Sequence, residues 1–161
     1  MSPVTARDEL ARLIGAVVIN FNALEGALHN LVWSGIGAGP RIGGSLSRSK
    51  DAKGLGQMLG DLLTADAFGE DAQQVREILQ ELGANGQTAG LVERRNRIIH
   101  AVLFNYVSDE AGAVLIRLRD LLKQPEESLE RAVGKEELVA VANDALQLAH
   151  RVSAISQRRE P

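Results

Sequence analysis

The sequence predicts a mainly all-α protein, a four- to five-helix up-down bundle with a small β-hairpin at about residues 102–119. Over several long segments apolar residues recur at steps of three and four, which is the spacing of amphipathic helices. Clusters of glycine and proline separate these segments, and only one short region alternates in the way a strand does. With 161 residues the chain fits one domain, 1–161, that can bury a single core.

The clearest predicted element is a long first helix. It begins at about Thr5, which with Asp8 forms a start similar to a capping box. Its apolar seam can pack inside its own subunit or against a partner helix, and consists of Leu10, Ile14, Val17, Phe21, Leu24, Leu28 and Leu31. The glycines of 35–39 and 43–44 then predict a loop. Because no strand precedes them, they lack the context of a phosphate-binding loop.

Three more helices are predicted before the hairpin, at about 49–65, from about 70 to the glycines of 83–86, and at about 87–102. Gly83-Ala-Asn-Gly86 either ends or kinks the second of these. The predicted buried positions of the first two are Leu55, Met58, Leu59, Leu62, Leu63, Val75, Ile78, Leu79 and Leu82.

Downstream of His100 the pattern becomes strand-like. The aromatic residues Phe104 and Tyr106 alternate with Asn105 and Val107, as side chains do in a strand. Residues 109–112 predict a turn, and a second alternating run follows at 114–119. A short apolar run of this kind can equally be helical. Residues 120–134 form a polar connection to a last helix at about 135–156, whose seam consists of Leu138, Val141, Ala145, Leu148, Val152 and Ile155.

The composition indicates the cellular compartment of the protein. The chain has no cysteine, which excludes disulfides and thiolate metal sites, and its first residues lack the features of a signal peptide. The longest apolar run, around residues 13–21, is interrupted by Asn20 and is shorter than the ~20 residues of a membrane span. We therefore expect a soluble, cytoplasmic protein that makes no membrane contact.

A net charge of −3 gives the surface no broad basic field, so any phosphate site must be local. The densest positive stretch is Arg94-Arg95-Asn96-Arg97. Arg94 and Arg97 are candidate contacts to RNA phosphates, although a charge cluster is as often a solvated helix face.

On a helix, Arg95 falls near the middle of an apolar arc, and Asn96 and His100 share one margin of it. Glu93, Arg94 and Arg97 fall on the opposite, solvated side. An arginine cannot lose its proton, so one directed toward an apolar surface requires a carboxylate, a carbonyl cage or a bound anion. Glu25, beside the seam of the first helix, is the internal candidate, and an Arg95–Glu25 ion pair would be purely structural.

The segment Arg95-Asn96-Arg97-Ile98-Ile99-His100, in a helical chain whose first helix carries Asn-Ala-Leu-Glu at 22–25, resembles the HEPN superfamily. The resemblance implies a compact bundle that forms a homodimer, brings two Arg/His motifs together in a cleft and often cleaves RNA without a metal, as a toxin or defence ribonuclease. Glu25 resembles the acidic residue that many members carry on the first helix. Val102 stands where the toxins regulated by a nucleotidyltransferase have tyrosine, which argues against that form of regulation.

These residues suit ribonuclease chemistry. At cellular pH an imidazole such as His100 can accept or donate a proton, Arg95 can hold a phosphate, and Asn96 can orient either. Glu25 completes the set of candidate catalytic residues. We expect RNA as substrate, an antitoxin protein as a further candidate partner, and no cofactor or metal.

The alternative is a non-catalytic HEPN-like nucleotide-binding or protein-interaction module with a structural Arg95–Glu25 ion pair. His29 and His150 have no second ligand at metal-binding spacing, and are expected to be structural or surface residues. Phe21 and Trp33 are expected in the core.

Overall fold

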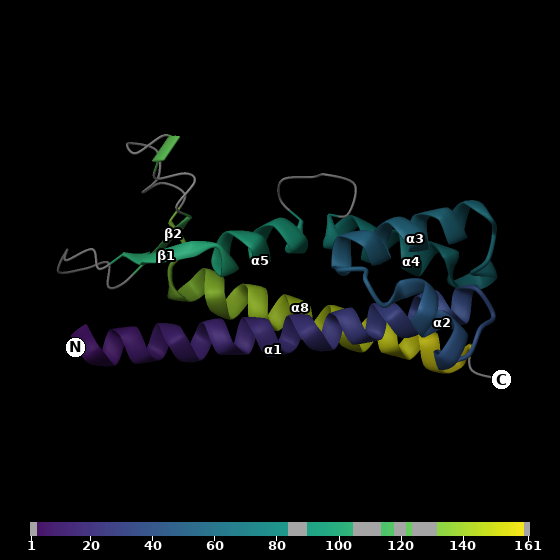
Figure 1. Cartoon of the computed structure of the whole chain (residues 1–161), viewed down its shortest axis with the longest axis horizontal. Helices are drawn as coiled ribbons and strands as arrows, with labels where there is room; N and C mark the ends of the chain where they lie inside the picture. The colour runs from purple at the N-terminus through teal and green to yellow at the C-terminus, as the bar shows by residue number, and fades with distance from the viewer. Residues whose placement is uncertain (1–2, 84–89, 105–113, 118–121, 124–131, 160–161) are drawn as a thin grey trace.

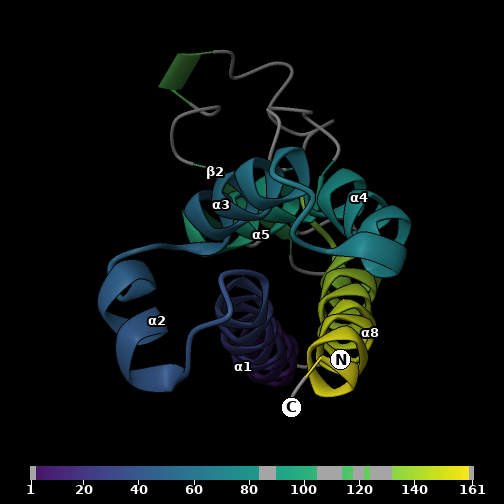
Figure 2. The same cartoon turned by 90° about the vertical axis from the view of Figure 1, so that its right-hand side faces the viewer.

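The computed structural model describes residues 3–83, 90–104, 114–117, 122–123 and 132–159. Within these ranges the protein is a helical bundle with one small hairpin, as predicted. Figures 1 and 2 show α1 (Pro3–Gly35) and α8 (Lys135–Arg158) side by side along the molecule, with α2 (Pro40–Ser47) flanking α1. A second layer lies across them and consists of α3 (Ala52–Thr64), α4 (Ala72–Leu82), preceded by a 3₁₀ turn at Gly69–Asp71, and α5 (Leu91–Ile99).

The core lies between α1, α8 and the second layer. α1 and α8 run in the same direction, since a salt bridge joins Glu9 in the second turn of α1 to Lys135 at the start of α8, and Asn20 donates to the carbonyl of Ala142 at 2.9 Å further along. The predicted seams are confirmed. All their positions on α4 and α8 are buried, and on α1 and α3 only Ile14, Met58, Leu62 and Leu63 are partly exposed.

The first three helices alternate in direction. α2 runs antiparallel to α1, and α3 runs parallel to α1. α4 then runs back beside α8, with Arg158 against Asp71 at one end and Arg151 against Glu81 at the other. Gly83 ends α4 in the left-handed conformation with φ 70°. A Cβ on Gly90 would lie 2.3 Å from the Cα of Gly83, so the two backbones touch and α5 begins where α4 stops. Gly83 therefore ends the helix, and the rest of the predicted 83–86 segment lies outside the described residues.

The loop predicted across 35–44 is wrong in its second half. Pro40 starts α2, and Gly43 and Gly44 lie inside this helix. A proline fits the first turn of a helix because its missing N–H would have no partner there. The glycines are tolerated because α2 packs directly on Trp33, and a Cβ on Gly43 would lie only 2.2 Å from Cδ1 of that indole.

The β-hairpin is confirmed in β1 (Ala101–Phe104) and β2 (Val114–Arg117), which pair antiparallel with Ala101 opposite Arg117 and Phe104 opposite Val114. The predicted turn at 109–112 and most of the polar connection at 120–134 lie outside the described residues.

By length and composition alone, α1 could cross a membrane over Asp8–Gly35, and a third of the most apolar part of this stretch is buried in the bundle. A core helix of a soluble protein passes the same test. The seam of α1 packs against α8 and α3, which accounts for much of its apolar character.

Candidate functional site

Helix α5 carries the Arg-Asn-x-x-x-His motif, and it is held by Leu91 and Ile98, which are both buried. It is shorter than the predicted 87–102, because residues 101–104 continue as a strand. His100 is the C-cap, and its backbone N–H donates to the carbonyl of Asn96 at 3.1 Å. The motif therefore occupies the last turn and a half of the helix, at the junction with the hairpin.

Arg95 is directed inward, as the helical arc predicts. Its guanidinium lies over the ring of Phe21 on α1, with Cζ 5.3 Å from the ring centroid. One terminal nitrogen donates to Oδ1 of Asn96 at 3.1 Å, while the buried Nε has no hydrogen-bond partner. A permanently charged group is thus held on an aromatic face without a carboxylate among the described residues.

The Arg95–Glu25 ion pair of the alternative prediction does not form. Glu25, one turn along α1 from Phe21, instead accepts a hydrogen bond at 3.2 Å from the backbone N–H of Ala52. Asp51 caps the same helix start by accepting from Gly54 N–H at 2.9 Å. Two carboxylates at the positive end of α3 are electrostatically favourable, which explains why Glu25 lies there.

Arg94 does not face solvent freely, contrary to expectation. Its Nε lies 2.8 Å from Oε1 of Glu137 and its Nη1 lies 2.6 Å from Oδ2 of Asp144, both on α8. The hydrogen bond to Glu137, opposed by partial burial, raises the pKa of the Arg94 guanidinium. Because two carboxylates already compensate this charge, Arg94 fixes α5 to α8 and is a poor candidate for an RNA phosphate contact.

The remaining motif residues lie at the accessible edge of α5. His100 is exposed, whereas Asn96 and Arg97 are partly buried. The structure thus brings Arg95 and Asn96 into direct contact, with His100 one turn after Asn96 and Glu25 committed to a different helix end.

This arrangement suits acid–base chemistry on an anion. The guanidinium of Arg95 is partly exposed and makes one side-chain hydrogen bond among the described residues, so it offers charge-assisted donors, and the exposed imidazole of His100 can exchange protons with a bound group. In the described part of the chain, no three His, Asp or Glu residues gather as a metal site.

Sequence reasoning missed the role of Phe21, because its position in the α1 seam marked it only as core. It also missed Ser47, which is fully buried and hydrogen-bonded to both His29 and Trp33. Neither contact has a local sequence signal. The contact of Phe21 with Arg95 joins helices that are distant along the chain, and the contacts of Ser47 depend on how α2 packs against α1.

Comparison with known protein families, with curated proteins and with solved structures gave no match. The HEPN resemblance therefore stays a prediction, and the function has to be argued from the residues of α5 and their surroundings.

Proposed function

We propose that the protein is a metal-independent endoribonuclease of the HEPN type that acts as a homodimer in the cytoplasm, in a toxin or defence role. The observation that supports the proposal most directly is that the charge of Arg95 is not compensated by a carboxylate among the described residues. This cation is packed on Phe21 and is partly exposed, and it is close in sequence to an exposed His100. Such a cation favours an anionic ligand, and an RNA phosphate is the anion that an adjacent imidazole can act on.

In the proposed reaction, His100 takes the proton of a ribose 2′-hydroxyl, and that oxygen attacks the adjacent phosphorus. The bond to the 5′-oxygen breaks, and a second imidazole donates a proton to this leaving group. The products are a 2′,3′-cyclic phosphate and a 5′-hydroxyl. Arg95 stabilises the negative charge that develops on the phosphate oxygens, and Asn96 keeps Arg95 oriented through their hydrogen bond.

A homodimer follows from the need for two imidazoles. Each chain supplies one histidine of this motif, and a two-fold axis would bring a second His100 to the same phosphate. We expect sedimentation to show a dimer. Mixing wild-type chains with excess His100→Ala chains should then lower the activity per wild-type subunit, because mixed dimers hold only one imidazole.

The test is cleavage of single-stranded RNA in EDTA by wild type, His100→Ala and His150→Ala. Both histidines are exposed, so neither substitution removes a buried contact. We expect His100→Ala to lose cleavage by at least ~100-fold and His150→Ala to cleave like wild type, with cyclic phosphate ends on the products. Equal activity of wild type and His100→Ala would overturn the proposal.

A non-catalytic interaction module is the second candidate. The favouring observation is that Arg94 and Arg95 both make contacts between helices, with α8 and α1 respectively. In this alternative the α5 arginines only hold the bundle together, and purified wild-type protein cleaves no RNA.

A further inference from the structure

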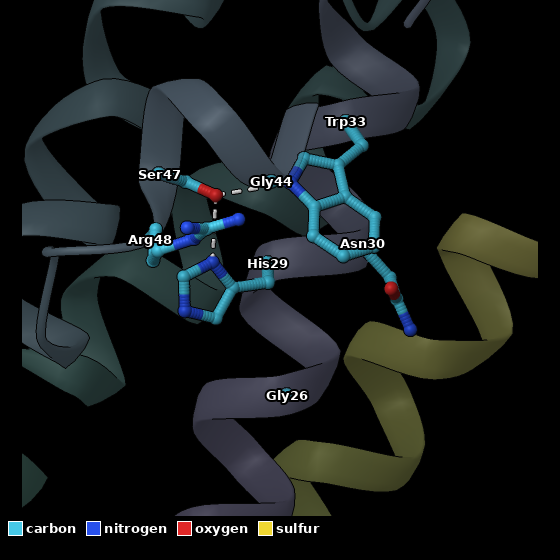
Figure 3. Close-up of a pocket in the computed structure, with 7 residues that line it drawn as sticks. All are labelled: Gly26, His29, Asn30, Trp33, Gly44, Ser47 and Arg48. Atoms are coloured by element: carbon cyan, nitrogen blue, oxygen red, sulfur yellow. Dashed lines mark hydrogen bonds between the residues drawn. The ribbon is translucent and has the colours of Figure 1, made fainter. Parts of the chain in front are cut away.

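A shallow cavity of about 450 Å³ that is open to solvent lies between the C-terminal half of α1 and α2 (Figure 3). The side chains that matter in its wall are those of His29, Asn30, Trp33, Ser47 and Arg48. His29 follows Phe21 by eight positions, or ~12 Å along the helix axis. The cavity is therefore separate from the Arg95–His100 motif.

Hydrogen bonds to Ser47 determine which ring nitrogen of His29 donates and which accepts. The hydroxyl has one proton and two lone pairs. The indole N–H of Trp33, which can only donate, lies 3.0 Å from this Oγ, and the Gly43 carbonyl, which can only accept, also lies 3.0 Å from it. The hydroxyl proton thus goes to Gly43, and the second lone pair accepts from Nδ1 of His29 at 2.8 Å. This assignment leaves Nε2 of His29 as a hydrogen-bond acceptor that is available to a donor group of a ligand.

Trp33 provides a rigid aromatic wall. α2 approaches the indole so closely that only glycine fits at 43, and the His29 ring lies 6.0 Å from it at a tilt of 41°. Because its N–H is bound to the buried Ser47, the indole is held in one orientation before any ligand arrives. A held aromatic wall of this kind suits stacking by a planar ring.

The one charged side chain among the residues that line the cavity is that of Arg48. Its guanidinium is exposed and forms no hydrogen bond or ion pair with the described residues. No carboxylate lines the cavity, and Glu25, one turn before His29, is occupied by the Ala52 N–H. A guanidinium beside an indole can recognise a phosphate joined to a flat aromatic ring, and the acceptor Nε2 of His29 can receive a hydrogen bond from the rest of such a ligand.

We propose that this cavity binds a nucleotide, with its phosphate on Arg48, its base against Trp33, a hydroxyl or amine group of the nucleotide donating to Nε2 of His29, and the amide of Asn30 at the edge of the base. The volume is within the range of small-molecule sites. The nucleotide is either free or part of an RNA strand. The site does not depend on the ribonuclease proposal, since it shares no residue with the α5 motif.

The experiment follows the fluorescence of Trp33, the single tryptophan of the chain, during titration with adenosine 5′-monophosphate or a short single-stranded oligoribonucleotide. Calorimetry with the same probes measures affinity independently of the probe's absorbance. The test variant is Arg48→Gln. Its matched control is Arg41→Gln, which changes another exposed arginine of the same segment that does not line the cavity.

We expect a saturable fluorescence change in wild type, affinity lowered at least ~10-fold in Arg48→Gln and unchanged affinity in Arg41→Gln. Binding of the mononucleotide identifies a free nucleotide as the ligand, and binding of the oligonucleotide alone, if Arg48→Gln weakens it, assigns the cavity to an RNA strand. The proposal is overturned if wild type binds neither probe, or if Arg48→Gln binds as wild type or no worse than Arg41→Gln.

Discussion

The guanidinium of Arg95 lies 5.3 Å above the ring of Phe21, and this contact joins the motif helix to the longest helix of the bundle. The ring positions the cation without neutralising it, which a carboxylate would do. Arg159 lies over Phe68 in a similar way, at 5.1 Å, but two of its nitrogens donate to backbone carbonyls. The comparison shows how much of the hydrogen-bonding capacity of Arg95 is unused.

Phe21→Leu should reduce RNA cleavage as well as stability. The substitution keeps an apolar side chain in the core but removes the aromatic face under Arg95, so the guanidinium is less well held. We expect a loss of about 1–2 kcal/mol in the free energy of unfolding, measured by urea denaturation.

The matched control is Phe68→Leu, which removes the equivalent stacking partner of Arg159 away from α5. It should lose similar stability while cleaving RNA as fast as wild type. If both variants lose cleavage to the same degree, the effect is one of general stability and Phe21 does not position Arg95.

Arg94→Gln should destabilise the bundle without weakening RNA binding. The Arg94 side chain is 25% exposed and its two carboxylate partners are more exposed, so we expect a modest loss of about 0.5–1.5 kcal/mol. Urea denaturation measures the loss, and titration with labelled RNA measures binding. A large drop in RNA affinity at unchanged stability would restore Arg94 as a phosphate contact.

Gly43→Ala should destabilise the protein, although alanine is the better helix former. The added Cβ would meet Trp33 Cδ1 at 2.2 Å, and such overpacking costs about 1–3 kcal/mol. Gly60→Ala in α3, where nothing lies within 4 Å of the added Cβ, should instead stabilise by about 0.5–1 kcal/mol. Thermal melts of both variants give the comparison, and equal melting temperatures would contradict the packing described for α2.

Acid should weaken the contact between α4 and α8. Hydrogen bonding and charge attraction from Arg158, and then Arg159, lower the pKa of Asp71 below its ordinary 3.8. The carboxylate therefore contributes stability that is complete above about pH 4 and is lost as the pH falls through its lowered pKa. Asp71→Asn should be less stable than wild type at neutral pH, and the difference should vanish in strong acid. A difference that is constant across this range would show that Asp71 acts without its charge.

Most of the fold follows from the sequence, because the long apolar seams and the glycines at 83–86 carry local signals. The seam of α8 and the alternation at Phe104 and Val114 predict a buried helix and a hairpin directly. α2 was missed because Gly43 and Gly44 normally disfavour a helix. Glycine is present in this helix because of a tertiary contact, since only glycine at position 43 permits the close packing on Trp33.

The candidate site is only partly predictable in the same way. Helical periodicity correctly predicts that Arg95 is directed inward. The side chain that Arg95 contacts is Phe21 rather than Glu25. The carboxylate of Glu25 lies at the start of α3, where it accepts a backbone hydrogen bond. The carboxylates that bind Arg94 belong to α8. Periodicity gives the direction of a side chain, whereas its partner depends on which helices pack together.

The most direct test of the central claim is the rate of RNA cleavage by Arg95→Ala, measured where urea denaturation shows the variant to be fully folded. We predict a rate at least ~100-fold below wild type, with a loss of stability of about 1 kcal/mol from the lost stacking on Phe21. Cleavage at the wild-type rate by the folded variant would contradict the claim that Arg95 binds the phosphate.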